Sequence, residues 1–564
     1  MKKRTDIIKS LRALYPKTAV ILDKYDKEKE IPVADLRIGD IFVVRPGEIV
    51  PVDGVVIEGS SAVNEAALTG KKAPVDKHIG SKVMAATTNN SGYLKCRATR
   101  VGEDTTLYRV IKLVSESMDS NASGNDRAAM ISKILIPIEL LFAVLTFVIW
   151  KLAGQTVIFS LLRAMTVLLI SCPWILIPIT KEVFRAGIGL GAKNGIFFRN
   201  LEILEKAEKV SVIALEKTGT ITKGEPFVTD VFTPDSITRS GYSLINNSEN
   251  ELLRIAGLLE RKSNHPLAKA VVDYVGDVNN YIEDLDEEGE DITDFEILPG
   301  YGLKAKYQDQ EVVGASLKYI SAYASLLPEV REKAVGLASQ GKTPICFTKG
   351  KKLLGIIAVS DAVKDETKEA IKELKGMGLH SVMLTGDNVR TSMAIADQAG
   401  IDEVAAEILP DKKKDIINEL SNNGMTAIVG DGSYDESLLD AADIGIAIGA
   451  FADVDKVSSD IVLMKNDLLD VSSAIRLSRL ISQKLRRNLF VLTFYNIIAM
   501  IFGSGVLLLP LDRVVSPIAA VLINCIFILI LYLNIYRLKS SNIYDQSKDY
   551  TMKDAISEEI LNGL

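Results

Sequence analysis

The sequence predicts a multidomain membrane protein. An α-helical bundle of four membrane spans carries a β-rich domain and an α/β domain that contains an inserted α+β domain. Three observations support this fold class: apolar residues of the 564-residue chain gather in a few long runs, short punctuated strands fill a region near the N-terminus, and strands alternate with helical sequence after residue 195. A chain of this length predicts several domains rather than one.

Four apolar runs are candidate membrane spans. They cover residues 133–150, 157–179, 489–509 and 514–536. The last two hold almost no charge over about 20 residues, the length needed to cross a bilayer. Glu139 and Arg163 interrupt the first two, and charged residues inside a span usually face protein or water. The alternative, that the runs are buried helices of a soluble protein, stays open and is stronger for the first two.

Four spans place both termini on one side of the membrane. The stretches 1–130, 180–485 and 539–564 are long and rich in Lys and Arg, whereas the connections 151–156 and 511–513 are short. The start of the sequence lacks the apolar segment of a secretory signal. We therefore expect a multi-pass protein of the cell membrane, with both termini and the large domains in the cytoplasm.

Composition limits the class of partner. The chain has 73 Asp and Glu against 66 Lys and Arg, which argues against a nucleic-acid partner. Its four cysteines lie far apart without a CxxC pair, so neither a disulfide framework nor a zinc knuckle is expected. The bilayer is the partner that the sequence predicts directly.

The domain boundaries follow from changes of pattern. Residues 31–101 have the short runs of a small β domain, and residues 225–352 interrupt the later strand and helix alternation as an insertion. Strands of a parallel doubly wound sheet are expected at VSVIAL, GIIAVS, HSVMLTG, MTAIVGD and IGIAIG. The chain is predicted to begin with a β-rich domain (1–130), followed by spans 1 and 2 (131–180) and the first part of the α/β domain (181–224). The insertion (225–352) comes next, and the second part of the α/β domain (353–480), spans 3 and 4 (481–538) and a tail (539–564) follow.

Three predicted strand ends carry polar residues that a doubly wound sheet gathers at one edge, where ligands bind in this architecture. They read LEKTGT at 215–220, LTGDN at 384–388 and VGDGSYD at 429–435. Carboxylates and hydroxyls at such an edge suit Mg²⁺ and phosphate. Each segment alone could be an ordinary turn.

One match to the phosphate-loop pattern does not indicate a phosphate-binding site. Residues 336–343, GLASQGKT, fit the pattern G-x4-G-K-T, but this loop needs a strand before it and a helix after it. Here helical sequence precedes and a predicted strand follows, so we reject this reading.

Together and in this order, the three strand ends resemble the haloacid dehalogenase-type phosphorylation domain of the P-type ATPases. LTGKKAP at 68–74 resembles the loop of their actuator domain, and SCPWIL at 171–176 resembles their membrane motif. SNHPLAKAV at 263–271 is similar to the nucleotide-binding motif of the heavy-metal class. The chain is identified as a degenerate and N-terminally shortened member of the heavy-metal (class IB) P-type ATPase family, with an actuator domain and a nucleotide-binding insertion.

The resemblance implies a site for ATP and Mg²⁺. The residues implied in phosphoryl transfer are Glu216, Lys217, Thr218, Thr385, Asp387, Lys413 and, on the actuator loop, Lys71. Thr218 and Asp431 would hold Mg²⁺, with Asp435 supporting them. The residues implied around the nucleotide are Glu260, His265, Gly300, Gly302 and Gly314; without the family, the three glycines are equally well explained as turn residues.

Two positions depart from the family at the chemistry itself. Glu216 replaces the aspartate that accepts phosphate and adds a methylene, a displacement that can cost on the order of 100-fold in rate. Lys71 replaces the glutamate that orients water for dephosphorylation, and a lysine is cationic at neutral pH. Tyr434 also replaces an asparagine beside the metal aspartates.

The membrane motif is altered as well. Trp174 stands where the second cysteine of the motif is usual. The resemblance implies an intramembrane site for a soft metal ion at Cys172, Tyr495, Asn496 and Cys525, whereas isolated membrane cysteines are more often small apolar residues. The family places further helices upstream, so either the chain works with four spans or a separate membrane protein supplies the missing ones.

Two functions follow as hypotheses. The first is a pseudo-ATPase or regulatory subunit that binds Mg-ATP, changes conformation without forming a phosphoenzyme, and pairs Lys71 with Glu216 when the actuator domain docks. The alternative is an active ATP-driven heavy-metal cation transporter. A soluble phosphatase of the same superfamily would explain neither the spans nor the actuator-like region.

Overall fold

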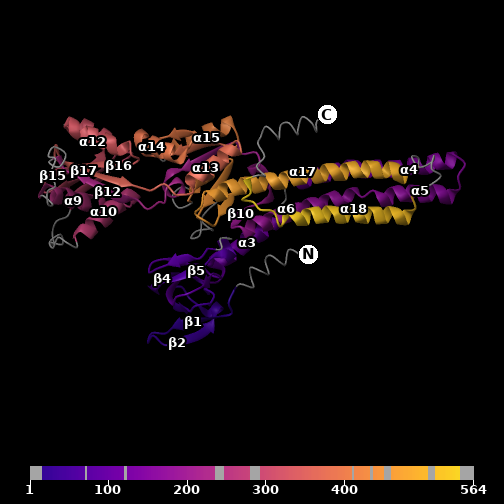
Figure 1. Cartoon of the computed structure of the whole chain (residues 1–564), viewed down its shortest axis with the longest axis horizontal. Helices are drawn as coiled ribbons and strands as arrows, with labels where there is room; N and C mark the ends of the chain where they lie inside the picture. Colours follow the sequence, from indigo (N-terminus) through magenta and orange to yellow (C-terminus); the bar gives the residue numbers. More distant parts are fainter. Residues whose placement is uncertain are drawn as a thin grey trace. The chain divides into compact units, whose positions relative to one another are not determined.

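A computed structural model describes residues 15–69, 73–119, 123–234, 247–279, 292–324, 326–409, 412–431, 436–449, 459–505 and 515–546. The chain divides into two compact units (Figure 1). The first comprises Met1–Lys209, Gly449–Lys465 and Asp470–Leu564; the second comprises Val210–Ile448 and Asn466–Leu469. The first unit contains the β-rich domain and the membrane helices, and the second contains two α/β domains.

The β-rich domain is built from two antiparallel sheets, ordered β2-β1-β3-β9-β4-β7 and β6-β5-β8. Its strands are β1 Thr18–Leu22, β2 Glu28–Pro32, β3 Ile41–Val44, β4 Asp53–Gly59, β5 Ser61–Asn64, β6 Val75–Lys77, β7 Lys82–Val83, β8 Thr88–Asn89 and β9 Leu94–Arg100, with the short helices η1 Val33–Asp35, α2 Ala66–Thr69 and η2 Gly102–Asp104. In β9, Leu94, Cys96 and Ala98 are buried while Arg97 and Thr99 are exposed. This period of two places alternate residues in the core.

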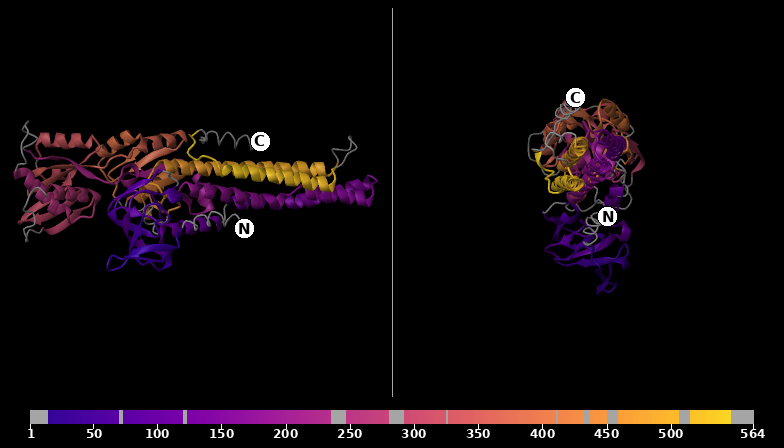
Figure 2. Two further views of the ribbon diagram at one scale, coloured as in Figure 1. Left: turned by 60° about the horizontal axis from the view of Figure 1, so that its bottom comes forward. Right: turned by 90° about the vertical axis from the view of Figure 1, so that its right-hand side faces the viewer.

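Long helices form the membrane part of the first unit, where they run side by side (Figures 1 and 2). They are α4 Ser123–Leu152, α5 Val157–Ile170, α6 Leu176–Lys193, α17 Leu469–Gly503 and α18 Pro517–Leu538, and α3 Thr106–Asp119 precedes them. The described residues hold four stretches long and apolar enough to cross a membrane: Arg127–Leu152, Val157–Lys193, Leu469–Gly503 and Pro517–Leu538. The predicted four spans are confirmed, although the second and third helices extend well beyond their apolar runs.

Pro173 interrupts the second span. The helix α5 ends before Ser171, the short turn η3 covers Pro173–Ile175, and α6 begins at Leu176. Proline cannot donate the backbone hydrogen bond that a continuous helix needs, so a break at this position is expected. After α6 the chain forms the strand β10 Ile196–Phe198, which pairs with β22 Ile461–Leu463, and the helix α7 Leu201–Ala207.

The second unit contains a parallel sheet in which β21, β20, β11, β18 and β19 are neighbours in this order. The strands are β11 Val212–Glu216, β18 His380–Leu384, β19 Glu403–Ala405, β20 Thr426–Gly430 and β21 Ile444–Ile448, and the connecting helices are α13 Thr367–Gly376, α14 Val389–Ala399, α15 Lys413–Asn423 and α16 Glu436–Leu439. The central strands are almost continuously buried, as expected where helices cover a parallel sheet.

The inserted domain is a six-stranded antiparallel sheet ordered β12-β17-β16-β15-β14-β13. Its elements are β12 Phe227–Phe232, α9 Asn247–Glu260, α10 Pro266–Asn279, β13 Thr293–Leu298, β14 Gly302–Tyr307, β15 Gln310–Ser316, α11 Leu317–Tyr323, α12 Pro328–Ala338, β16 Thr343–Lys349 and β17 Lys352–Ser360. One core lies between the sheet and α9 with α10, and a second lies between the sheet and α11 with α12. Helices therefore cover both faces.

One strand was expected in the wrong sheet. We predicted Gly355–Ser360 as a strand of the parallel sheet, but β17 pairs antiparallel with β12 and β16 in the inserted domain. Both kinds of sheet need a short apolar strand here, and hydrophobic periodicity does not reveal a strand's partner. The phosphate-loop rejection is confirmed, because α12 precedes Lys342 and β16 follows it.

Candidate active site in the second unit

Three parallel strands bring the predicted chemical residues to one edge of the sheet. Glu216 is the last residue of β11, which lies between β18 and β20. Thr385 follows β18 and Asp431 follows β20 at the corresponding ends. Because parallel strands end at the same edge, residues more than 200 positions apart in sequence become neighbours.

The Glu216 carboxylate is held between a lysine and a glycine. Its Oε1 lies 3.0 Å from Nζ of Lys413, the first residue of α15, and the side chains are only 14% and 17% exposed, respectively. A Cβ added at Gly430 would lie 2.6 Å from Glu216 Oε2. The carboxylate therefore extends over the backbone of β20, and a side chain at residue 430 would require the end of the Glu216 side chain to move.

Asp431 supplies a second carboxylate beside the turn that follows Glu216. Gly219 in this turn, η4 Lys217–Ile221, has φ of +75°, and a Cβ there would lie 2.9 Å from Asp431 Oδ2. Carboxylate and hydroxyl oxygens are ligands that Mg²⁺ accepts, so Asp431 and Thr218 of this turn are chemically suited to hold the ion. Two further predicted residues, Asp435 and Lys71, lie outside the described residues.

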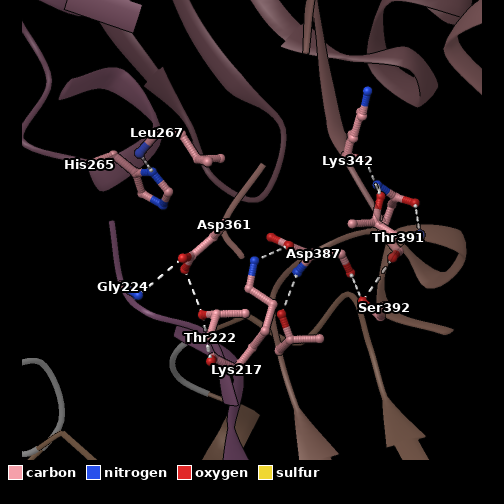
Figure 3. A network of polar contacts seen from close by, with 12 residues as sticks. Lys217, Thr222, Gly224, His265, Leu267, Lys342, Asp361, Asp387, Thr391 and Ser392 are labelled. Carbon is pink, nitrogen blue, oxygen red and sulfur yellow. Dashed lines mark hydrogen bonds and ion pairs between the residues drawn. The ribbon is translucent and has the colours of Figure 1, made fainter. Parts of the chain in front are cut away.

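Lys217 and Asp387 form a largely buried ion pair at the same edge (Figure 3). The Lys217 ammonium donates to Asp387 Oδ2, and the Asp387 amide donates to Thr385 Oγ1 at 3.1 Å. These contacts join the turn after β11 to the loop after β18. The structure thus brings Lys217, Thr385 and Asp387 together, as the sequence predicted.

Two residues that sequence reasoning missed stabilise the turn after Glu216. Asp361 accepts hydrogen bonds from Thr222 Oγ1 at 2.6 Å and from the Gly224 amide at 3.0 Å. The Lys364 ammonium donates to the Gly219 carbonyl at 2.8 Å and to Asn466 Oδ1 at 2.6 Å. Burial lowers the pKa of Lys364 to about 8. The sequence contained a sign of both residues, because Asp361 and Lys364 belong to the short segment DAVK that directly follows the apolar strand β17.

His265 lies close to the Lys217–Asp387 pair (Figure 3). Its Nδ1 accepts a hydrogen bond from the Leu267 amide at 3.2 Å, so the proton of the neutral ring is on Nε2. Desolvation lowers the pKa of His265, while the Asp387 charge acts in the opposite direction. Although part of the residue is exposed, the ring is therefore neutral at pH 7 and presents an N–H donor.

The other predicted nucleotide residues lie in the inserted domain. Glu260 ends α9, is 5% exposed, and has its pKa raised to about 7 by burial. The glycines have packing reasons of their own: a Cβ at Gly302 would overlap the Gly314 carbonyl, a Cβ at Gly314 would lie 2.6 Å from Phe347, and a Cβ at Gly300 would lie 2.9 Å from Leu409. Nucleotide binding at these positions stays a prediction.

Two contacts hold the inserted domain against the parallel-sheet domain. Thr391 Oγ1 in α14 donates to the Lys342 carbonyl at 2.8 Å. Lys318 in α11 pairs with Glu407 at 2.8 Å. His265 can therefore lie near Lys217 and Asp387 at the edge of the parallel sheet within one compact unit.

The predicted membrane residues have unequal roles in the first unit. Asn496 Oδ1 accepts hydrogen bonds from Ser171 Oγ at 2.8 Å and from the Cys172 amide at 2.7 Å. The Tyr495 hydroxyl donates to the Ile170 carbonyl at 3.0 Å. Both side chains thus stabilise the break between α5 and α6. Cys172 is buried and Cys525 is exposed, and in the described part of the chain no three His, Cys, Asp or Glu residues are gathered as a metal cluster.

Comparisons with known proteins identify the family. A family model described as the P-type ATPase actuator domain matches residues 13–115, and one described as haloacid dehalogenase-like hydrolase matches residues 210–443. The chain belongs to the heavy-metal (class IB) P-type ATPase family. The predicted fold class and the multi-pass membrane location agree with this membership.

Individual relatives carry heavy-metal names. The chain is 39% identical over 516 residues to a probable copper-exporting P-type ATPase of Archaeoglobus fulgidus, spanning 91% of this chain and 61% of the relative. It is 38% identical over 547 residues to copper-transporting ATPase 1 of Rhizobium meliloti, spanning 96% and 64%. The crystal structure of a zinc-transporting PIB-type ATPase in the E2.Pi state matches with a TM-score of 0.54 and 28% identity, covering 94% of this chain and 83% of that one. The chain thus spans about three fifths of the length of the two named relatives.

Proposed function

We propose that the chain is the nucleotide-driven, ion-binding part of a heavy-metal cation transporter, and that Glu216 accepts the γ-phosphoryl group of ATP. The observation that carries the proposal is the Glu216 carboxylate at the end of the central strand, 3.0 Å from Lys413. Attack by this carboxylate on the γ-phosphorus forms an acyl phosphate and releases ADP. The positive charges of Lys413 and Lys217 lie where they can stabilise the transferred group.

Mg²⁺ fits the carboxylate edge, where Thr218 and Asp431 would hold it. When bound, the ion neutralises charge on the phosphate oxygens. His265 lies close to the Lys217–Asp387 pair with its ring proton on Nε2 and would donate to the nucleotide, while Glu260 would line the nucleotide site in the inserted domain. The names of the relatives support a heavy-metal cation as cargo.

Specific observations also favour a second candidate, a nucleotide-responsive pseudo-ATPase that regulates a membrane partner. The longer side chain of Glu216 reaches over Gly430, so its nucleophilic oxygen is displaced from where an aspartate oxygen would lie. Lys71 cannot act as the base for dephosphorylation while it is cationic. The partner would be a separate membrane protein. Pairing of Lys71 with Glu216 stays a prediction; in the structure Glu216 pairs with Lys413.

Acid-quench labelling separates the two candidates. Purified, detergent-solubilised protein is incubated with γ-labelled ATP and Mg²⁺, with and without soft or divalent metal ions, and then quenched. A hydroxylamine-sensitive label that is lost in Glu216→Gln supports the transporter. Absence of label, together with nucleotide binding that is lost in His265→Gln, supports the pseudo-ATPase. Glu403→Gln, at an exposed glutamate on the same sheet, is the matched control.

A further inference from the structure

Two arginines lie at the cytoplasmic ends of the last two spans. Arg487 lies two residues before the apolar run 489–509, and Arg537 directly follows the run 514–536. Because the large domains are cytoplasmic, α17 enters the membrane at this end and α18 leaves it here. Both arginines are exposed. They therefore lie where the hydrocarbon core meets the lipid headgroups.

A hydrogen bond between the two helices brings these arginines to one place. The Lys484 ammonium of α17 donates to Asn534 Oδ1 of α18 at 2.5 Å. On α17, Arg487 follows Lys484 by three residues. On α18, Arg537 follows Asn534 by three residues, a spacing at which side chains share one face of a helix. Three cations thus gather around one contact between the helices, and the charges of both arginines act on the Lys484 ammonium.

These three charges lack a counter-ion within the described part of the chain, where no carboxylate lies within ion-pair distance of them. The adjacent Arg486 differs, because Glu208 Oε1 lies 2.6 Å from its guanidinium. Like charges that gather without a counter-ion repel one another, and a bound anion relieves this repulsion. Arg486 is therefore neutralised by the chain itself, whereas Arg487 is left for an anion from outside.

Apolar side chains border the cluster on its membrane side. Phe490 follows Arg487 by three residues on α17, and it is exposed. Leu533 precedes Arg537 by four residues on α18, and it is exposed as well. Each therefore lies on the same helix face as its arginine. An anion with acyl chains contacts both the charges and this apolar surface, whereas a free phosphate ion contacts only the charges.

We propose that Lys484, Arg487 and Arg537 form a site for the phosphate group of an anionic membrane lipid, whose acyl chains lie along the apolar faces of α17 and α18. The planar guanidinium groups can each offer phosphate two parallel hydrogen bonds, and Lys484 adds a compact positive charge. Lys and Arg directly cytoplasmic of a span each strengthen binding of anionic lipid by about fivefold. The site is separate from the phosphoryl-transfer edge and requires neither ATP nor a transported ion.

Lipid titration of the full chain in detergent tests the site. Short-chain phosphatidylglycerol is the anionic probe, phosphatidylcholine with the same acyl chains is the zwitterionic reference, and native mass spectrometry counts the bound lipid. We expect binding of phosphatidylglycerol to weaken about fivefold in Arg487→Gln and in Arg537→Gln. Arg486→Gln is the matched control and should bind as the parent does, because Glu208 already neutralises this arginine. Arg487→Lys keeps the charge and should retain most of the affinity.

Three results would overturn the proposal. They are equal phosphatidylglycerol affinity in Arg487→Gln and Arg486→Gln, phosphatidylcholine binding as tight as that of phosphatidylglycerol, or displacement of the lipid by inorganic phosphate at a similar concentration. The last result would identify free phosphate as the ligand.

Thermal unfolding in nanodiscs gives a second readout, which also shows whether each variant is folded. Phosphatidylglycerol should raise the unfolding temperature of the parent above its value in phosphatidylcholine. The increase should be smaller in the double variant Arg487→Gln/Arg537→Gln, and an equal increase contradicts the site. Because these measurements use no ATP, a failure of the proposed phosphoryl transfer leaves them unchanged.

Discussion

The Lys413 ammonium lies 3.0 Å from Glu216 Oε1, which pairs the first residue of α15 with the last residue of β11. The other oxygen, Oε2, lies over Gly430 of the neighbouring strand. An aspartate at residue 216 is one methylene shorter and would hold its carboxylate nearer to the end of its own strand. If Glu216 accepts the phosphoryl group, as proposed, its reach sets where that group can be accepted.

Glu216→Asp should increase phosphoenzyme formation, because it returns the nucleophile toward the strand end. The expected increase is on the order of 100-fold in the rate of acid-stable labelling from γ-labelled ATP. Adding Lys71→Glu should then speed loss of the label, since a glutamate can orient water where a cationic lysine cannot. Glu216→Asn is the control that must stay unlabelled. A labelling rate in Glu216→Asp at or below that of the parent would contradict the explanation that the longer side chain of Glu216 slows phosphoenzyme formation.

Gly430→Ala tests the same geometry through stability. The added Cβ would lie 2.6 Å from Glu216 Oε2 and would push the end of this side chain away from Lys413, so we expect a loss of about 1 kcal/mol in the second unit, measured by urea-dependent proteolysis. In a Glu216→Asp background the shorter side chain should relieve most of that loss, giving a favourable coupling energy between the two changes. Gly376→Ala, where no atom lies within 4 Å of the added Cβ, is the matched control. Equal losses in both backgrounds would show that the carboxylate is not the obstacle.

Glu260 predicts a specific pH dependence of stability. Burial raises its pKa from 4.5 to about 7, so the folded state binds more protons than the unfolded state between these values. Stability of the second unit should therefore fall as pH rises from about 4.5 to 7, by at most about 3 kcal/mol. Glu260→Gln should remove this slope and be the more stable protein at pH 8.

Urea-dependent proteolysis at several pH values between 4.5 and 8 measures the slope. Other groups titrate in the same range, so the informative quantity is the difference between parent and variant. Glu329→Gln, at an exposed glutamate of the same domain, should leave the profile unchanged. Parallel profiles for the parent and Glu260→Gln would mean that Glu260 is ionised and stabilised in the folded state.

Local patterns were enough to predict much of the fold and the phosphoryl-transfer edge. Span length gave the four membrane helices, and the strand-end motifs placed Glu216, Thr385 and Asp431 at one edge because parallel strands end together. The partners of a strand in a sheet, by contrast, could not be predicted from local sequence pattern. The apolar strand Lys352–Ser360 fits either sheet by its pattern, and only its register with β12 and β16 places it in the inserted domain.

Roles inside the membrane were harder to predict for a similar reason. Motif position indicated Asn496 and Tyr495 as ion ligands, but their hydrogen bonds to residues 170–172 depend on which helices lie together. Asp361 and Lys364 were missed because their contacts with the turn after Glu216 span more than 130 residues. A sequence pattern identifies a polar residue, whereas the tertiary contact decides whether it binds a ligand or supports the backbone.

Asn496→Ala distinguishes a backbone-supporting role from ligation. The change removes the acceptor of Ser171 Oγ and of the Cys172 amide, and leaving buried donors unsatisfied costs on the order of 1–3 kcal/mol. We expect a lower unfolding temperature of the metal-free protein by tryptophan fluorescence, which reports on the first unit because Trp150 and Trp174 both lie there. Asn488→Ala, on the same helix, removes only a long 3.4 Å contact with Asn534 and should have a smaller effect. A ligand role for Asn496 requires the reverse pattern, with unchanged unfolding of the metal-free protein and lost binding of the heavy-metal cation.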